Sequence, residues 1–307
     1  METSAGFEIR TFKVLTPPTE VCDEKSVVQF VDSSEGRKLS CYPVNRTVAI
    51  VPARLASTRL PGKALIEIAG KPMVCWVAER ARAARNVDRV IVATDSQQIL
   101  DAVQQTGIEA VLTAPDHMSG TDRVAEVAGN LPDAEIVVNV QGDEPMISPA
   151  TIERAVDTMA DEISKANGAG IVTTWESIES IGDLLNPDLV KVVLDDNENA
   201  VYFSRSPIPY PRDAVKRHGS PAAALENEPE LLKLFRKHTG LYVYRRDVLL
   251  EFTKWPPARL EQIEALEQLR ALEHGIRIKV VEACAASTGV DTFADLERVR
   301  ELMVQTA

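Results

Sequence analysis

The sequence predicts an α/β fold with a doubly wound, mostly parallel sheet. Short runs of β-branched residues alternate with segments of helical periodicity from residue 47 onward, which is the βαβ pattern of such sheets. One of these runs, 136–140, is apolar on both faces, as expected for a central strand of a parallel sheet. Polar motifs directly follow two of the runs, at 52–63 and 141–145. Open α/β sheets bind their ligands at the ends of such strands.

In the first half of the domain, the predicted strands are 47–51, 90–93, 110–113 and 136–140. Pro72 opens a helix whose apolar residues fall on one face, namely Met73, Val74, Val77, Ala78 and Ala81. A short helix is expected at 97–106, ended by Gly107. Two further helices are expected to begin after Ser119 and at Ser148-Pro149, because serine is a favoured N-cap and proline a favoured first residue.

The second half is less regular. Strands are expected at 170–174, 190–194, 200–203, 241–244 and 277–281, and the polar residues 195–199 suggest a hairpin between two of them. The proline-rich and charged stretch 207–237 suggests a mobile or substrate-covering loop region. One helix is expected to bury the spaced residues Leu260, Ile263, Leu266, Leu269 and Leu272. Thr292 is expected to cap a last helix, which would bury Leu296, Val299 and Met303.

Composition describes an ordinary globular protein and excludes several classes. The 307 residues include 34 basic and 46 acidic side chains, giving a formal net charge of -12, so general nucleic-acid binding is not expected. No apolar stretch reaches the roughly 18 residues of a membrane span, and residues 1–46 lack the apolar core of a signal peptide. We therefore expect no membrane insertion and a cytoplasmic location. The four cysteines are widely spaced and indicate neither a zinc site nor a disulfide framework.

The predicted organisation has three parts. Residues 1–46 mix charges, prolines and weak apolar runs, which indicates a poorly ordered or loosely docked extension. Residues 47–303 form the domain, with 189–245 as a smaller sheet region inserted in it, and 304–307 form a tail.

The loop 54–71 has an excess of positive charge in an acidic chain. Arg54, Arg59, Lys63 and Lys71 stand there against a single acid, Glu67. Such a loop after a strand is suited to neutralising the phosphates of a polyphosphate. It is not a Walker A loop, because Ser57 and Ala64 stand where that motif needs glycine and a hydroxyl residue. A solvated basic turn is the structural alternative.

Two separated carboxylates are candidates for binding a metal ion. Asp143, with Glu144 beside it, follows a strand and a glycine bend, and Asp291 precedes the last helix. Mg²⁺ prefers one or two protein carboxylates together with substrate phosphates. The alternatives are an ordinary turn acid at Asp143 and a helix-start acid at Asp291 that interacts with the helix dipole.

Two further motifs suit a nucleotide and a sugar. At the start of the helix after Ser119, Gly120 would let a nucleotide approach closely, and Arg123 could pair with a phosphate. His238 and Tyr242 lie in a polar, aromatic stretch that could form a sugar-binding wall. The structural alternatives are a simple helix cap and a satisfied surface or core histidine. His117, His218 and His274 have no comparable setting. No covalent nucleophile is apparent, so the pattern favours phosphoryl or nucleotidyl transfer.

Several motifs, in order along 47–303, resemble those of the 3-deoxy-manno-octulosonate cytidylyltransferases, also called CMP-Kdo synthetases. They are Pro52-Ala53-Arg54, Ser57-Thr58-Arg59-Leu60-Pro61-Gly62-Lys63, Ser119-Gly120-Thr121-Asp122-Arg123, Gln141-Gly142-Asp143-Glu144-Pro145, Tyr202-Phe203-Ser204-Arg205, His238 with Gly240 and Tyr242, Leu266-Glu267-Gln268-Leu269-Arg270 and Gly289-Val290-Asp291-Thr292. The resemblance implies a Rossmann-like nucleotidyltransferase fold with a smaller mixed-sheet region for dimerisation and sugar binding.

The resemblance also implies an activity: CTP and the acid sugar 3-deoxy-D-manno-octulosonate (Kdo) give CMP-Kdo and pyrophosphate, with Mg²⁺, for lipopolysaccharide biosynthesis. The implied CTP-binding residues are Arg54, Ser57, Lys63, Gly120 and Arg123, with Lys63 stabilising the leaving group. The implied metal ligands are Asp143 and Asp291. The implied sugar-binding residues are Gln141, His238, Tyr242, Glu267 and Arg205. Arg54, Lys63, Asp143 and Asp291 are thereby the expected catalytic residues, and members of the family form homodimers.

Two alternatives remain at this stage. The enzyme could use CTP with another acid sugar, such as a sialic-acid-like or amino-substituted one, although the Gln141, His238, Tyr242 and Glu267 set favours Kdo. A nucleotide-binding regulatory module without catalysis is a different class. The presence of Arg54, Lys63, Asp143 and Asp291 argues against it.

Overall fold

A computed structural model describes residues 47–56 and 60–305 of the chain, and the expectations for 1–46 and for Ser57 lie outside the described residues. The strands are β1 (Thr47–Ala53), β2 (Glu67–Ile68), β3 (Lys71–Pro72), β4 (Arg89–Thr94), β5 (Glu109–Leu112), β6 (Ile136–Asn139), β7 (Ile171–Ser177), β8 (Lys191–Leu194), β9 (Ala200–Ser204), β10 (Arg236–Arg245) and β11 (Ile278–Glu282).

The α-helices are α1 (Met73–Arg82), α2 (Gln97–Gln104), α3 (Gly120–Gly129), α4 (Pro149–Ile163), α5 (Ile181–Leu185), α6 (Arg212–His218), α7 (Pro221–Asn227), α8 (Arg246–Phe252), α9 (Arg259–Glu264), α10 (Gln268–Glu273) and α11 (Phe293–Gln305). Two 3₁₀ helices, η1 (Lys63–Leu65) and η2 (Pro229–Leu234), complete the elements of the described residues. Among these helices, none is long and apolar enough to cross a membrane.

The main sheet has the strand order β11-β7-β10-β6-β1-β4-β5. β1 pairs in parallel with β4 and β6, β4 with β5, and β7 with β11, whereas β10 is antiparallel to both β6 and β7. Six of these seven strands therefore share one direction, which confirms the prediction of a mostly parallel sheet. The hairpin of β8 and β9 joins this sheet where Lys191 pairs with Lys237 of β10, and its turn is bridged to β11 by Asn199 and Lys279.

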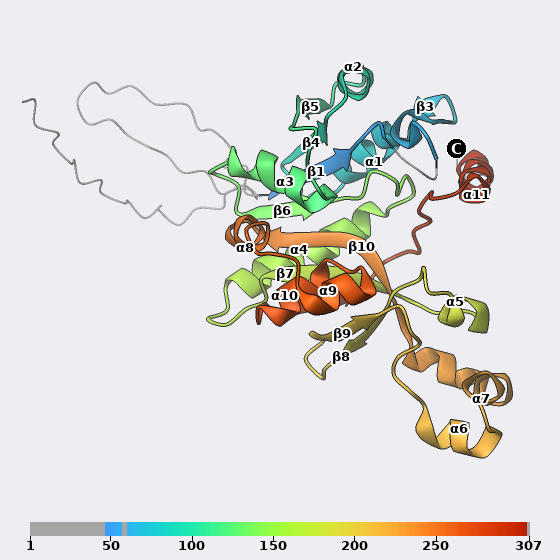
Figure 1. Ribbon diagram of the computed structural model, residues 1–307. Helices are drawn as coiled ribbons and strands as arrows, with labels where there is room; N and C mark the ends of the chain where they lie inside the picture. Colours follow the sequence, from blue (N-terminus) through green and yellow to red (C-terminus); the bar gives the residue numbers. More distant parts are fainter. Residues whose placement is uncertain (1–46, 57–59, 306–307) are drawn as a thin grey trace, which may run out of the picture. The chain divides into compact units, whose positions relative to one another are not determined.

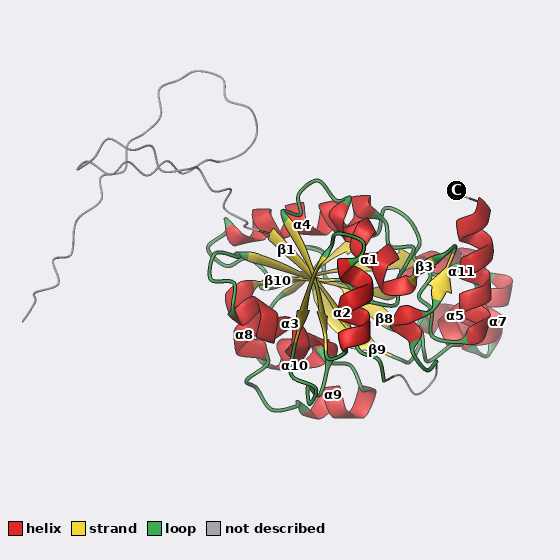
Figure 2. Ribbon diagram, turned by 90° about the horizontal axis from the view of Figure 1, so that it is seen from above, coloured by secondary structure: helices red, strands yellow, loops and turns green. Residues whose placement is uncertain are grey.

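Helices cover both faces of the twisted sheet (Figure 2). In β1, Ala49 and Val51 pack into a cluster with residues of α1, α2 and α4, while Val48 and Ile50 pack into a second cluster with residues of α3, α8 and α10. Alternate side chains of one strand thus enter opposite cores, as the period of two requires. The result is the predicted doubly wound arrangement, with the predicted apolar face of α1 fully buried.

Two expectations for the second half are wrong. The stretch 207–237 is not a loop region but contains α6, α7 and η2. Leu225 of α7 and residues of η2 pack with Leu184 of α5 in one hydrophobic cluster, at the lower right of Figure 1. Ser220 caps α7 by accepting a hydrogen bond from the Ala223 N–H at 3.1 Å, and Pro221 begins that helix. This N-cap pair gives the stretch a helix start that its charge and proline content conceal.

The helix expected over 260–272 is broken in two. Ala265 adopts a left-handed conformation with φ of 51° between α9 and α10. The Glu264 carboxylate accepts hydrogen bonds from the Ser204 hydroxyl and the Arg205 N–H, and the Arg205 side chain binds the carbonyls of Glu264 and Ala265. These contacts satisfy groups that a continuous helix would have used. Leu260 and Ile263 consequently stay 37% and 69% exposed.

Candidate functional site

A pocket of about 250 Å³ opens where the carboxyl ends of β1 and β6 meet the start of α3. Parallel strands end at the same edge of the sheet, so residues distant in sequence converge there. The lining residues are Pro52, Ala53, Arg54, Ala56, Lys63, Ala64, His117, Ser119, Gly120, Arg123, Gln141, Gly142, Asp143 and Asp291. Seven of the residues predicted to form the site therefore share one pocket: Arg54, Lys63, Gly120, Arg123, Gln141, Asp143 and Asp291.

Lys63 lies between the two carboxylates that were predicted to bind metal. Its Nζ is 2.6 Å from Asp143 Oδ2 and 2.8 Å from Asp291 Oδ1. The lysine side chain is 13% exposed, whereas those of Asp143 and Asp291 are 38% and 49% exposed. The carboxylates thus retain a face toward solvent or a ligand while the cation is largely covered.

Backbone geometry brings these three residues together. Gly62 has a φ of 65° at the start of η1, a conformation that glycine adopts without strain. A Cβ atom on Gly142 would lie 2.7 Å from the Pro52 carbonyl oxygen, so only glycine lets the loop after β6 pass the end of β1. The Val290 N–H donates a 2.9 Å hydrogen bond to the Asp143 carbonyl, which holds the segment carrying Asp291 beside Asp143.

A buried polar network supports the same segment. The Ser287 hydroxyl donates to Glu144 Oε2 at 2.9 Å, and the Ser287 N–H donates to Glu176 Oε1 at 2.9 Å. Lys237 pairs with the other Glu176 oxygen at 2.6 Å. Burial, with the neighbouring charge of Asp143 as a second cause, raises the pKa of Glu144 to about 7. This network was not foreseen, since Glu176, Lys237 and Ser287 form no local motif.

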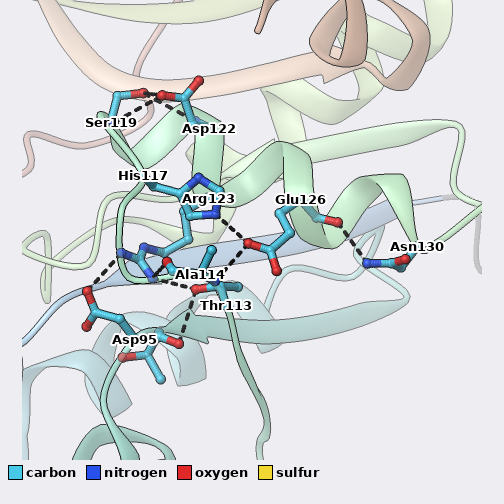
Figure 3. Close-up of polar contacts among 10 residues, drawn as sticks. Asp95, Thr113, Ala114, His117, Ser119, Asp122, Arg123, Glu126 and Asn130 are labelled. Atoms are coloured by element: carbon cyan, nitrogen blue, oxygen red, sulfur yellow. Dashed lines mark hydrogen bonds and ion pairs between the residues drawn. The ribbon is translucent and has the colours of Figure 1, made fainter.

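Figure 3 shows the wall that α3 contributes. Arg123 is buried, and its guanidinium donates to Asp95 Oδ2 at 2.9 Å and also contacts the Thr113 hydroxyl. The cation is therefore already paired with a carboxylate. Ser119 and Asp122 form a reciprocal capping box at the start of the helix, which confirms the predicted cap. Whether Arg123 also meets a phosphate stays a prediction.

His117 belongs to this wall, contrary to the expectation that it had no special setting. Its Nε2 contacts Glu126 Oε2, and the same carboxylate accepts the Ala114 N–H at 3.0 Å (Figure 3). Burial opposes ionisation of Glu126, but these two hydrogen bonds outweigh it and hold its pKa below the usual range. The only signal in the sequence is the position of His117 two residues before the Ser119 cap.

The residues predicted for the sugar do not line the pocket, apart from Gln141. His238 and Tyr242 lie within β10, with ring centroids 5.4 Å apart. β10 passes close to the pocket, because a Cβ on Gly240 would lie 3.2 Å from Gln141 Cγ. Burial lowers the pKa of His238 to about 3 and raises the pKa of Tyr242. Both rings are therefore uncharged at neutral pH.

Glu267 and Arg205 have partners within the fold. Glu267 Oε2 accepts a 2.7 Å hydrogen bond from the Thr121 hydroxyl, at the start of α3. The Arg205 guanidinium donates to the carbonyls of Pro187, Glu264 and Ala265 at 3.0, 2.7 and 3.3 Å. The start of α3, next to Gly120, is thus linked to Glu267, whose contact with a sugar stays a prediction. Arg205 therefore holds backbone carbonyls in place, which its sequence motif does not indicate. Its contact with a sugar stays a prediction.

The residues of this pocket are chemically suited to an anion and a hard cation together. Arg54 and Lys63 offer positive charge, and Asp143 and Asp291 offer oxygen ligands. No cluster of three or more potential metal ligands occurs in the part of the chain that the structure describes, so two carboxylates would need phosphate and water oxygens to complete an octahedral shell. This arrangement suits substitution at a phosphorus atom.

Comparison with known proteins gives a consistent result. A family model described as cytidylyltransferase matches residues 48–278. The 3-deoxy-manno-octulosonate cytidylyltransferase of Geobacter sulfurreducens is 51% identical over 256 residues, covering 82% of this chain and 97% of that protein. The enzyme of the same name from Pseudomonas fluorescens is 51% identical over 257 residues, covering 83% and 96%.

Comparison with solved structures also finds proteins of this fold. CMP:2-keto-3-deoxy-manno-octonic acid synthetase complexed with CTP matches with a TM-score of 0.75 and 43% identity, covering 85% of this chain and 100% of that one. A 4-diphosphocytidyl-2C-methyl-D-erythritol synthase from Anaerococcus prevotii, at 13% identity and a TM-score of 0.53, shares the fold alone.

Proposed function

Because this chain belongs to the 3-deoxy-manno-octulosonate cytidylyltransferase family, we propose that it transfers the cytidylyl group of CTP to the anomeric hydroxyl of Kdo, giving CMP-Kdo and pyrophosphate for lipopolysaccharide biosynthesis. The observation that supports it most directly is the convergence of Asp143 and Asp291 on Lys63 Nζ, at 2.6 and 2.8 Å, in a pocket at the carboxyl ends of parallel strands.

The chemistry needs positioning and charge neutralisation more than covalent participation by the protein. A bond forms between the sugar oxygen and the α-phosphorus, the α–β phosphoanhydride bond breaks, and pyrophosphate and the hydroxyl proton are released. Arg54 and Lys63 line the pocket and would neutralise the triphosphate. Lys63 would stabilise the negative charge that develops on pyrophosphate. Ser57 of the same loop is proposed as a further CTP contact.

Asp143 and Asp291 would hold Mg²⁺. One oxygen of each carboxylate already contacts Lys63 Nζ, so the two carboxylates can point at a single cation. The oxygen donors suit a hard ion that takes its remaining ligands from phosphates and water. When bound, Mg²⁺ would lower the pKa of the attacking hydroxyl and neutralise charge on both substrates. Chelation with EDTA should abolish turnover, and added Mg²⁺ should restore it.

The sugar would lie along β10, on the side of the pocket formed by Gln141. His238 and Tyr242 would contact it from β10, and Glu267 from the start of α10. Each of the three side chains is already oriented by a neighbour, through the aromatic contact of His238 with Tyr242 and the hydrogen bond from Thr121 to Glu267.

The test is a pyrophosphate-release assay with CTP, Mg²⁺ and a panel of eight-carbon and nine-carbon acid sugars. Turnover with Kdo is the expected result. Turnover with a different acid sugar and none with Kdo would replace the assignment by the second candidate, a cytidylyltransferase for a sialic-acid-like or amino-substituted sugar. Asp143→Asn should lose most activity, whereas Asp101→Asn, at an exposed position of helix α2, should not.

We also propose that the protein is a homodimer and works in the cytoplasm. Among the described strands β9 pairs only with β8, and Val201 on it is 58% exposed. An open strand edge with an exposed apolar residue is suited to association with a second copy. Light scattering should give the mass of a dimer, and Val201→Lys should shift the protein toward the monomer.

A further inference from the structure

The hydroxyl of Thr173 has one proton but three potential hydrogen-bond partners. Thr173 is fully buried in β7, and its Oγ1 lies 2.7 Å from the Leu241 carbonyl oxygen, 3.3 Å from the Thr239 carbonyl oxygen and 2.9 Å from His238 Nε2. Both carbonyls lie where the β7–β10 register shifts. A carbonyl oxygen can only accept a hydrogen bond, so the single hydroxyl proton points to Leu241.

This count determines which nitrogen of His238 carries hydrogen. Once the Thr173 proton is given to Leu241, Oγ1 faces Nε2 with a lone pair, and the contact at 2.9 Å is a hydrogen bond only if Nε2–H donates. Desolvation lowers the pKa of His238 to about 3, so the ring has one hydrogen at neutral pH. Nδ1 is then a bare acceptor.

Nδ1 of His238 is available to a ligand. It has no hydrogen-bond partner among the described residues. It also keeps some exposed surface, because the described polar atoms that are both fully buried and without a partner do not include it. The ring is oriented by Phe203, whose centroid is 4.9 Å away edge-on, and by Tyr242 at 5.4 Å. Its acceptor atom is therefore fixed by packing on two sides and by Thr173 at Nε2.

We propose that Thr173 fixes His238 as the neutral Nε2–H tautomer, and that the bare Nδ1 accepts a hydrogen bond from a hydroxyl group of the acid sugar. Thr173 is then a positioning residue, and His238 binds a hydroxyl proton without removing it. The identity of the ligand rests on the proposed function. The tautomer does not, because it follows from the contacts of Thr173 and from the burial of the ring.

The first experiment measures the tautomer without any substrate. The protein is labelled with ¹⁵N-histidine, and the His238 signals are assigned among the four histidines by their loss in His238→Gln. At neutral pH the wild type and Thr173→Ser should show a protonated Nε2 and an unprotonated Nδ1. Thr173→Val, which keeps the shape and removes the hydroxyl, should show averaged signals of mixed tautomers. A protonated Nδ1 in the wild type, or an unchanged tautomer in Thr173→Val, would overturn the assignment.

The second experiment measures kinetics with Kdo and CTP. Thr173→Val should raise the KM for the sugar by about tenfold, the loss of roughly one hydrogen bond, and leave the KM for CTP unchanged. Thr173→Ser should restore the wild-type KM. Thr174→Val is the matched control, since Thr174 is the next buried threonine of β7 and contacts Thr239 rather than His238.

The two experiments separate the possible failures. An unchanged KM for the sugar in Thr173→Val, together with the expected tautomer change, would overturn the contact between Nδ1 and the sugar. No turnover of any acid sugar by the wild type would instead contradict the proposed function, while the NMR result would still decide the tautomer.

Discussion

Lys63 gives the pocket its electrostatic character. Two carboxylates and one ammonium meet within hydrogen-bond distance, so the three side chains together have one net negative charge. This favours a further cation at the carboxylates, while the lysine remains next to the place where phosphates would bind. Without the lysine, Asp143 and Asp291 would repel each other. The same side chain therefore stabilises the free site and would neutralise the leaving group.

Replacing Lys63 should damage catalysis far more than folding. Lys63→Met should lower kcat by about 10²- to 10³-fold, the typical cost of losing one group that stabilises transition-state charge. Steady-state pyrophosphate release measures it. Lys71→Met is the matched control, because Lys71 is a partly buried lysine that pairs with Glu79 at 2.6 Å and does not line the pocket. Equal losses in the two variants would contradict the role of Lys63.

His238 should make folding sensitive to moderate acid. Burial lowers its pKa from the ordinary 6.5 to about 3 in the folded protein, so between these values the unfolded chain binds a proton and the folded chain does not. The protein therefore keeps its full stability, as far as His238 is concerned, above the pKa of this histidine in the unfolded chain, and it loses stability as the pH falls below that value. Between pH 7 and pH 5, the wild type should lose about 2 kcal/mol more unfolding free energy than His238→Gln. Urea denaturation at the two pH values measures this, and parallel losses would refute it.

At the scale of elements, the local sequence pattern is sufficient to predict a strand or helix whose buried residues follow a single strand or helix periodicity. β1, β4, β6 and α1 were predicted from apolar runs and one helical face, and the structure buries those residues as expected. The break between α9 and α10 could not be predicted, because it depends on hydrogen bonds from Ser204 and Arg205, about 60 residues away in sequence. Long-range polar contacts override helical periodicity there.

The sequence predicts those site residues that lie directly at the ends of strands or at the start of a helix. Lys63, Asp143 and Asp291 were expected from charged motifs after strands or before a helix, and the pocket contains them. The partners of Arg123 and Arg205 were not, since an arginine in a motif does not show whether its charge is already satisfied by the fold. His117 and Ser287 were missed for the related reason that their partners are not adjacent in sequence.

The start of α11 should influence the proposed metal site at Asp291. The Asp295 carboxylate accepts hydrogen bonds from the N–H groups of Asp291 and Thr292, at 3.1 and 2.8 Å. Asp295→Ala should destabilise the protein by about 1 kcal/mol, the usual cost of a lost cap, and should raise the Mg²⁺ concentration needed for half-maximal rate, because Asp291 would no longer be held. Glu297→Ala, on the same helix and paired only with Arg300 at the surface, is the control. Unfolding free energies and Mg²⁺ titrations are the measurements.

At the scale of the whole molecule, catalysis should require only one of the two units of the chain. The chain divides into a first unit, 1–44, and a second unit, 45–307, and every described residue that lines the pocket belongs to the second unit. The Geobacter sulfurreducens relative is 97% covered by a match of 256 residues, which leaves little of its length for a counterpart of the first unit. A variant beginning at Asn45 should therefore keep kcat and both KM values within about twofold of the wild type. Kinetics and thermal unfolding of the two proteins should be compared directly, because a large fall in kcat with an unchanged melting temperature would mean that the first unit takes part in the reaction.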